Sequence, residues 1–255
     1  MHPRNPIDIE AERSGEPVFR EVGVGPWAQT HPGEPRPDDP ASPAFDPYRY
    51  DSALLDEGDR RNVLDRYRYW SVAAIKADLD ARGRHDFEIA CENWTHDFNI
   101  GSMVRTANAF QARRVHIVGP HKWNRNGALM TELYSHVEHH PSIAELVECW
   151  RNRIAGEIAY ERSRMASDAR IRELEAARVI AMDIIPGAVP METYAFPKRC
   201  LLLFGAEGPG LTQTALDLAD DVVYISQFGS VRSINAGAAA AVTMHAWIAQ
   251  HAVIR

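Results

Sequence analysis

Residues 99–107 read NIGSMVRTA, and this stretch is the first indication of the fold class. Its Asn-x-Gly opening leads into an amphipathic segment, which predicts a helix over 100–110 with one inward-facing arginine, Arg105. The apolar run VHIV at 115–118 then predicts a strand. A loop and a helix start placed between two strands give the geometry with which α/β proteins hold ligands at the edge of a sheet.

Two later stretches have to be explained together with this one. Residues 201–211 read LLLFGAEGPGL, where a continuous apolar run over 201–204 predicts a strand buried on both faces, followed by a glycine-rich turn. Residues 225–241 read ISQFGSVRSINAGAAAA, and the helix expected over 233–247 is so rich in alanine that something must pack closely against it. Between them we expect a helix over 211–218, with Thr212 as its cap, and a strand over 222–225.

The rest of the chain continues this alternation of strands and helices. Such alternation predicts an α/β fold with a mostly parallel sheet and flanking helices. The further elements that we expect are helices over 59–82 and from 143 onward, a long helix or helical pair over 151–178, and strands over 87–91, 134–140 and 179–185.

The charge of the chain is unevenly distributed. The formal net charge is −7, but residues 1–59 hold 13 acidic side chains against 5 Arg, which leaves 22 acidic and 23 basic side chains in residues 60–255. Residues 98–131 contain no carboxylate, and their cations are Arg105, Arg113, Arg114, Lys122 and Arg125. A local positive field attracts phosphate even in an acidic molecule, so we expect these side chains to contact RNA; a solvated surface is the alternative.

The N-terminal segment has the composition of an arm. Residues 1–47 hold 10 of the 16 prolines and few clustered apolar side chains, which predicts an extended or disordered arm over about 1–50. We expect a helical extension over 51–85 and the main domain over 86–255. No apolar run approaches the roughly 20 residues that span a bilayer, and the first residues do not resemble a signal peptide, so we expect no membrane contact and a cytoplasmic location.

The cysteines and histidines do not indicate a metal site. Cys91, Cys149 and Cys200 are widely separated among apolar neighbours, and we interpret them as small buried hydrophobic residues. The histidines of the stretch SHVEHH at 135–140 suggest zinc, but no accompanying cysteine or carboxylate has a known ligand spacing. The expectation is therefore that the chain binds no metal.

The turn at 205–210 is the best candidate for a ligand site. It follows a buried strand at the edge where open α/β sheets bind ligands, and it matches neither a Walker loop nor a dinucleotide fingerprint. Its glycines allow the backbone to approach a flat ligand. Glu207 among them is costly to leave unpaired, so it is expected to hold a substrate group or backbone donors; the alternative is a cap for the following helix.

In order and spacing, the motifs N-x-G-x3-R-T-A, F-G-x-E-G-x-G and G-x3-S-x-N resemble those of the SpoU/TrmH family of SPOUT methyltransferases, over about residues 87–249. The resemblance implies a parallel sheet with a C-terminal trefoil knot, an exception to the rule against knots. It also implies a homodimer that uses S-adenosylmethionine to methylate a ribose 2′-hydroxyl of tRNA or rRNA.

The same resemblance assigns roles to individual residues. The catalytic residues that it implies are Asn99, Arg105, Glu207, Ser233 and Asn235. The cofactor-binding residues that it implies are Phe204, Gly205, Ala206, Glu207, Gly208, Ile225, Ser226, Gln227, Ser233, Ile234 and Asn235. Where the family usually has Ile-Pro-Met, this chain has Ile225, Ser226 and Gln227, so the backbone role is kept but the side chains differ.

Methyl transfer to a ribose hydroxyl requires in-line approach and removal of a proton, and it needs no metal. The family mechanism gives proton removal to Arg105, although arginine stays protonated in proteins. Two roles remain open for Arg105: a proton acceptor assisted by an RNA phosphate, or an anchor for that phosphate. The alternative function is a non-catalytic RNA-binding module. A nucleotide-binding oxidoreductase is disfavoured because residues 93–101 supply no glycine fingerprint.

Overall fold

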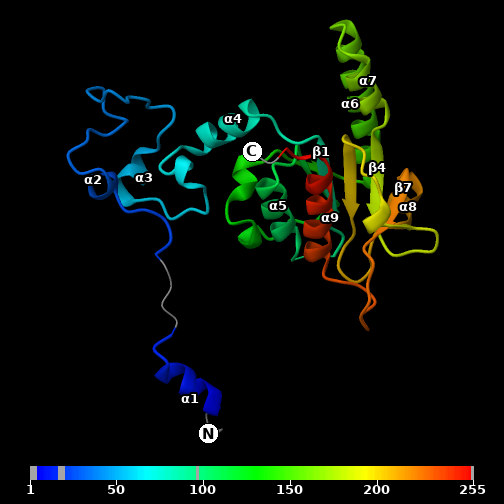
Figure 1. The fold of residues 1–255 in the computed structure, drawn as a ribbon, viewed down its shortest axis with the longest axis horizontal. Helices are drawn as coiled ribbons and strands as arrows, with labels where there is room; N and C mark the ends of the chain where they lie inside the picture. The colour runs from blue at the N-terminus through cyan, green and yellow to red at the C-terminus, as the bar shows by residue number, and fades with distance from the viewer. Residues whose placement is uncertain (1–4, 17–20, 96–97, 254–255) are drawn as a thin grey trace. The chain divides into compact units, whose positions relative to one another are not determined.

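The computed structural model describes residues 5–16, 21–95 and 98–253, and the chain forms two compact units, residues 1–70 and 71–255 (Figure 1). The predicted arm includes residues 1–4 and 17–20, which lie outside the described residues. The first unit contains short helices and turns: α1 (Pro6–Arg13), α2 (Trp27–Thr30), α3 (Ser52–Glu57) and the 3-10 turn η1 (Asp65–Tyr67). The predicted division at residues 50 and 85 stays a prediction.

A buried carboxylate organises the end of the first unit. Asp59 is fully buried and accepts hydrogen bonds from the Arg61 guanidinium at 2.7 and 2.9 Å and from the Tyr69 backbone N–H at 3.0 Å. Residues 59–70 are thereby held in a largely irregular conformation. The prediction of a helix over 59–82 is therefore wrong in its first half: α4 (Val72–Ala81) begins where the Ser71 hydroxyl accepts a hydrogen bond from the Ala74 N–H.

The second unit is built on a seven-stranded parallel sheet with the order β3-β2-β1-β6-β4-β7-β5. Its strands are β1 (Phe87–Glu92), β2 (Val115–Val118), β3 (Val137–His140), β4 (Arg178–Met182), β5 (Val189–Pro190), β6 (Cys200–Phe204) and β7 (Asp221–Tyr224). In the centre Ile89 pairs with Val115 on one side and with Leu202 on the other. The predicted α/β class with a mostly parallel sheet is confirmed.

Two layers of helices cover this sheet. On one face α5 (Ile100–Ala109) and α9 (Ala236–His251) lie side by side (Figure 1), and their apolar side chains pack with Phe87, Ile89 and Leu202. On the other face α6 (Ile143–Ser163) and α8 (Gln213–Leu218) pack over Leu201 and Leu203. Because strand side chains alternate between faces, each central strand is buried on both sides, as its apolar sequence predicts.

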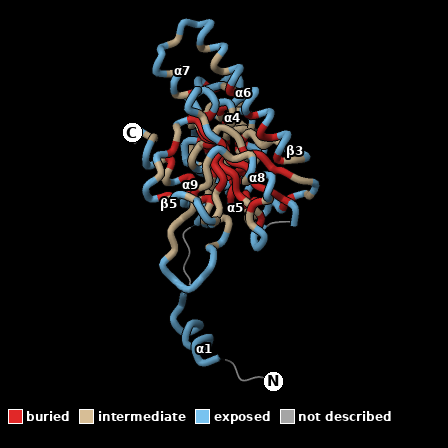
Figure 2. Tube along the Cα trace, turned by 90° about the vertical axis from the view of Figure 1, so that its right-hand side faces the viewer, coloured by how far each residue is buried: buried red, intermediate tan, exposed pale blue. Residues whose placement is uncertain are grey.

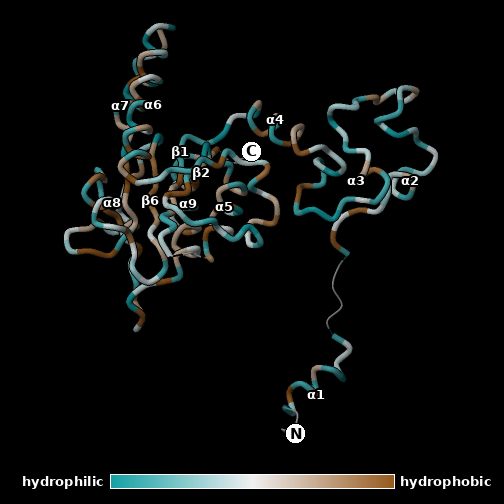
Figure 3. Tube along the Cα trace, turned by 180° about the vertical axis from the view of Figure 1, so that it is seen from behind, coloured by the Kyte–Doolittle hydropathy of each residue, from teal (hydrophilic) through white to brown (hydrophobic). Residues whose placement is uncertain are grey.

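The charged segment after residue 151 forms a helical pair, one of the two predicted forms. α6 continues to Ser163, and α7 (Asp168–Glu175) packs against it beyond the sheet (Figure 1). Most of this pair is exposed (Figure 2), and hydrophilic and hydrophobic residues alternate along it (Figure 3). The two helices pack against each other, and the exposed ion pair of Arg162 with Glu175 at 2.7 Å adds little to their stability.

The structure also bears on the predictions for the cysteines and for a membrane span. Cys91 and Cys200 are buried as predicted, but Cys149 is exposed, because it lies on α6 away from the side that packs on the sheet. Burial raises the pKa of the Cys200 thiol well above its usual range. Among the described helices, none has the length and apolar character that crossing a membrane requires.

Candidate active site at the carboxyl edge of the sheet

Three side chains from the three sequence motifs meet at one point. Asn99, which precedes α5, donates a hydrogen bond to the Glu207 carboxylate in the turn after β6. Asn235, which precedes α9, donates to Asn99 Oδ1 at 2.9 Å and to Glu207 Oε2 at 3.0 Å. These residues are up to 136 positions apart in the sequence. The parallel sheet brings them together because β1, β6 and β7 all end at the same edge.

Glu207 is not the cap of the helix that follows its turn. The cap of α8 is Thr212, whose hydroxyl oxygen accepts a hydrogen bond from the Ala215 N–H. Glu207 instead accepts amide donors from Asn99 and Asn235. Asn235 also caps α9, since its Oδ1 accepts from the Ala238 N–H at 3.1 Å. One side chain therefore ties the start of α9 to the first two motifs.

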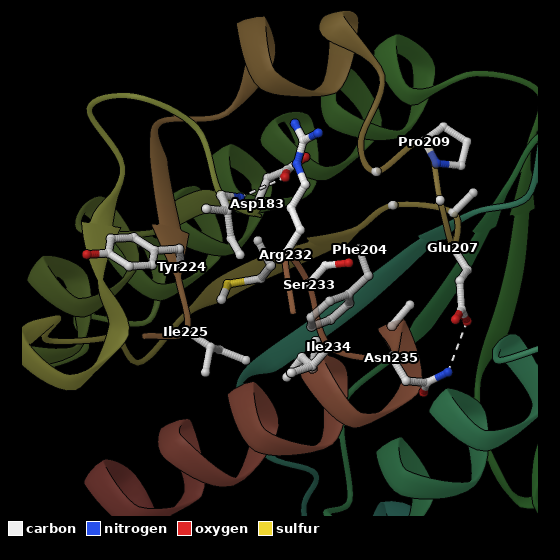
Figure 4. Close-up of a pocket in the computed structure, with 18 of the residues that line it drawn as sticks. Asp183, Phe204, Glu207, Pro209, Tyr224, Ile225, Arg232, Ser233, Ile234 and Asn235 are labelled. Atoms are coloured by element: carbon white, nitrogen blue, oxygen red, sulfur yellow. Dashed lines mark hydrogen bonds between the residues drawn. The ribbon is translucent and has the colours of Figure 1, made fainter. Parts of the chain in front are cut away.

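A pocket of about 410 Å³ opens beside the triad (Figure 4). Ten of the eleven residues predicted to bind the cofactor line it, and Ser226 is the exception. The other lining residues include Asp183 and Arg232, and in Figure 4 the carboxylates of Asp183 and Glu207 lie well apart. The remaining lining is Met182, Ile184, Pro209, Gly210, Val223, Tyr224, Ala236 and Ala239. Apolar walls with a few polar groups are typical of a small-molecule site.

The turn at 205–212 is tightly folded. A Cβ atom on Gly205 would lie 2.1 Å from the carbonyl carbon of Gly210, so only glycine fits there. Two carboxylates from strand ends hold the turn: Asp183 accepts from the Leu211 N–H at 3.2 Å, and Glu92 accepts from the N–H and the hydroxyl of Thr212, each at 2.7 Å. Glu92 and Asp183 were not among the residues predicted from the sequence, although acidic residues at the ends of buried strands are a usable signal.

Ser226, where this chain departs from the family pattern, has a carboxylate partner. Its N–H and hydroxyl donate to the Glu192 carboxylate at 3.1 and 2.8 Å. Hydrogen bonds from the backbone N–H of Glu192 and from Ser226 hold the pKa of Glu192 below its usual value. A proline at this position has no N–H and could not donate the first of these hydrogen bonds.

Arg105 lies outside this hydrogen-bonded group. It is on α5, about 9 Å along the helix axis from Asn99. The prediction that this arginine faces inward is wrong, because its position on α5 lies on the exposed side of the helix. Its side chain makes no hydrogen bond or ion pair with the described residues, and it does not line the pocket. Ser233, by contrast, lines the pocket. The structure thus brings together four of the five predicted catalytic residues and leaves Arg105 extended toward solvent.

The other predicted RNA-binding cations divide into two kinds. Arg113 forms ion pairs with Asp86 at 3.0 Å and with Glu157 at 3.1 Å, and Arg114 pairs with Glu138 at 2.7 Å. Fold contacts therefore compensate the charge of both residues, although the sequence around them lacks acids. Lys122 and Arg125 lie in the loop after β2, and the Arg125 guanidinium is 5.8 Å from the Trp123 ring centre. Trp123 is buried in the α5 core, so its role is structural.

Comparison with known proteins identifies the family. Residues 86–245 match the family model described as the SpoU rRNA Methylase family. The chain belongs to this family. Its three motifs are therefore the motifs of a SpoU methylase, and the triad and the pocket stand where those motifs meet. The resemblance read from the sequence is confirmed.

Curated relatives in the same family modify tRNA. The chain is 24% identical over 171 residues to the tRNA (guanosine(18)-2′-O)-methyltransferase of Escherichia coli K12, which covers 66% of this chain and 65% of the relative. It is 27% identical over 178 residues to the protein of that name from Thermus thermophilus, covering 64% and 74%. The chain thus spans slightly less than two thirds of the Escherichia coli relative.

Solved structures show the same fold. The SpoU methyltransferase AviRb from Streptomyces viridochromogenes, in complex with the cofactor AdoMet, superposes with a TM-score of 0.52 at 25% identity, covering 66% of this chain and 58% of that one. The TrmH/SpoU tRNA modifying enzyme of A. aeolicus superposes with a TM-score of 0.55 at 15% identity, covering 70% and 81%. The second likeness concerns the fold alone.

Proposed function

We propose that this SpoU family member is an S-adenosylmethionine-dependent methyltransferase that acts on a ribose 2′-hydroxyl of tRNA or rRNA. The observation that carries the proposal is the pocket beside the triad of Asn99, Glu207 and Asn235, since it is lined by the residues that the family motifs assign to the cofactor. The relatives from Escherichia coli and Thermus thermophilus carry the name of a tRNA 2′-O-methyltransferase. AviRb, a structural neighbour, is complexed with AdoMet.

The residues present fit this cofactor. The pocket volume suits a nucleoside-sized ligand, and Phe204, Ile225 and Ile234 provide apolar wall for a flat ring. Backbone groups of the turn at 205–208 and of Ile225 and Gln227 provide polar contacts beside it. When bound, S-adenosylmethionine supplies an electrophilic methyl group on a sulfonium. The role of the chain is to position that group and the ribose hydroxyl in line.

The triad and Arg105 then have distinct tasks. Asn99, Asn235 and Glu207 hold one another and thereby position the pocket edge, and Ser233 is placed to hydrogen-bond the ligand. Arg105 is exposed and unpaired among the described residues, which suits a residue that meets its partner only in bound RNA. It serves either as proton acceptor, assisted by an RNA phosphate, or as an anchor for that phosphate.

We further infer a homodimer with a C-terminal trefoil knot and a cytoplasmic location. The knot is supported by the way the segment after β7 returns to the turn after β6, where Asn235 meets Glu207. The dimer is supported by apolar side chains left exposed around α5 and α9, namely Leu129, Met130 and Val242. The location is supported by the tRNA named as substrate of the relatives.

The test is transfer of a radioactive methyl group from S-adenosylmethionine to bulk tRNA and rRNA, followed by nuclease mapping of the modified ribose. We expect labelling by the wild-type chain and its loss in Arg105→Ala. Absence of labelling on every RNA, with Arg105→Ala indistinguishable from wild type, would refute the proposal.

The non-catalytic module is the second candidate, motivated by the altered loop at Ser226 and Gln227. Calorimetry with S-adenosylmethionine separates the two functions. An enzyme should bind S-adenosylmethionine saturably, whereas a module that no longer catalyses methyl transfer does not need the cofactor, so absence of binding would favour the module.

A further inference from the structure

A polar cluster is buried in the second unit, on the face of the sheet opposite α5. Glu88 of β1, His116 of β2 and His140 of β3 are each less than a tenth exposed, and α6 covers this face of the sheet. Arg199, also fully buried, donates to Glu88 Oε1 at 2.6 Å. Buried charges of this kind are costly unless each has a partner, so the cluster requires a complete account of its hydrogen bonds.

Three donor atoms in this cluster have the spacing of metal ligands. His116 Nδ1 lies 3.0 Å from His140 Nε2, and Glu138 Oε2 lies 3.6 and 3.9 Å from these two nitrogens. A single point about 2.1 Å from all three atoms satisfies these separations, and this is the usual length of a zinc bond to imidazole or carboxylate. Two histidines and one carboxylate are a ligand set that zinc uses, with water in the fourth position.

The protons on the two imidazoles point to a cation between them. His116 Nε2 donates to the Glu88 carboxylate at 2.8 Å, so a neutral His116 presents a lone pair at Nδ1. A neutral His140 must then donate from Nε2, which leaves an acceptor at its Nδ1 facing a Glu145 carboxylate oxygen at 3.6 Å. That Nδ1 is buried and makes no hydrogen bond with any described residue. A cation bound by both imidazoles removes the conflict, because His140 Nδ1 then carries a proton toward Glu145.

The surroundings supply the outer contacts that metal ligands need. Glu88 orients His116, Glu145 faces the outer nitrogen of His140, and the Arg114 guanidinium donates to Glu138 Oε1 at 2.7 Å. Arg153 donates to Glu138 Oε2 at 3.0 Å, so it would share this oxygen with the ion. An extra proton on the histidine pair would also resolve the conflict, and direct titration with metal distinguishes the two.

We propose that His116, Glu138 and His140 bind one divalent transition-metal ion of the zinc class. The ion would join the edge strand β3 to β2, with its outer contact to α6 at Glu145, and so would stabilise this side of the sheet. The proposal departs from the sequence expectation of no metal, and it is independent of the methyltransferase function. Its failure would leave that function untouched.

The experiment uses the untagged full-length chain, stripped of metal with a chelator and titrated with ZnCl₂ and then CoCl₂ in a calorimeter. We expect saturable binding of one equivalent of Zn²⁺, a visible absorption band with Co²⁺, and a Zn²⁺-dependent rise in melting temperature. His140→Gln and Glu138→Gln should weaken Zn²⁺ binding at least tenfold and abolish the rise in melting temperature.

His139→Gln is the matched control, because His139 is exposed on the same strand and points to the other face. It should bind Zn²⁺ like wild type. The wild-type measurement decides the matter even if a cluster variant fails to fold. Absence of saturable binding by the folded wild-type chain, or wild-type affinity in a folded His140→Gln, would overturn the proposal.

Discussion

Asn235 performs two separable tasks, and two substitutions distinguish them. Its Oδ1 caps α9 through the Ala238 N–H, while its Nδ2 reaches Asn99 and Glu207. Serine is as good an N-cap as asparagine but is too short to reach the other motifs, so Asn235→Ser should lose only the Nδ2 contacts, about 1 kcal/mol of the free energy of unfolding. Asn235→Ala loses the cap as well and should be less stable than Asn235→Ser by a further ~1 kcal/mol.

Cofactor affinity should behave differently from stability. Both variants lose the Nδ2 contacts that position the pocket edge, so S-adenosylmethionine should bind about fivefold more weakly to each, a difference of about 1 kcal/mol in binding free energy. Urea unfolding measures the first quantity, and about 1 kcal/mol corresponds to a shift of about 2–4 °C in Tm for a unit of this size. Calorimetry measures the second. Equal destabilisation in the two variants, or unchanged cofactor affinity in both, would refute this division of roles.

Other contacts of the fold and the site give three further predictions. Glu92→Gln, which weakens the anchor of the turn at 205–212, should reduce S-adenosylmethionine affinity about threefold to tenfold in calorimetry while the unit stays folded. Burial alone would raise the pKa of Asp59, but hydrogen bonds from Arg61 and from backbone N–H groups lower it. The stabilisation of the first unit by Asp59 is therefore present above about pH 4 and is lost as the pH falls further. Near-ultraviolet circular dichroism should show this loss of structure, and Asp59→Asn should remove the pH dependence. Arg125→Ala should reduce by about 1 the slope of the logarithm of RNA affinity against the logarithm of salt concentration. Arg113 is already paired with Asp86 and Glu157, so Arg113→Ala should change this slope less and should lower stability instead. Equal slopes for both variants would contradict the distinction.

Local signals predicted the elements around the site closely. β2 occupies the expected residues, and α5 ends only one residue before the expected position. The agreement is close because α5 has a clear amphipathic period and a loop on each side. The expected helix over 59–82 failed in its first half for a physical reason. Its apolar spacing is helical, but Asp59 recruits Arg61 and the backbone of Tyr69 into a buried group that a continuous helix could not form. Tertiary contacts overrode the local pattern.

Partners that meet only in the folded chain were beyond a reading of the sequence. The stretch SHVEHH drew attention to neighbouring histidines, yet the fold places His140 beside His116, 24 residues away, and turns His139 to the other face. In the same way the absence of acids over 98–131 suggested an open basic surface, whereas Glu138 and Asp86 from other strands and loops reach Arg114 and Arg113. The pattern of charges along a chain does not show which of them form ion pairs, because the order of the strands in the sheet decides which side chains meet.

The carboxylates of β1 show how one buried strand serves both ends of the sheet. Glu88 and Glu92 point to the same face, four residues apart, and both are buried. In a strand covered on both sides such residues cost free energy unless they are fully paired, so their presence indicates an anchor. Glu92 holds Thr212 at the carboxyl edge, where the pocket lies, and Glu88 holds Arg199 and His116 nearer the amino edge. A mutation of Glu92 should therefore affect the turn beside the pocket, whereas a mutation of Glu88 should affect the buried cluster with Arg199 and His116.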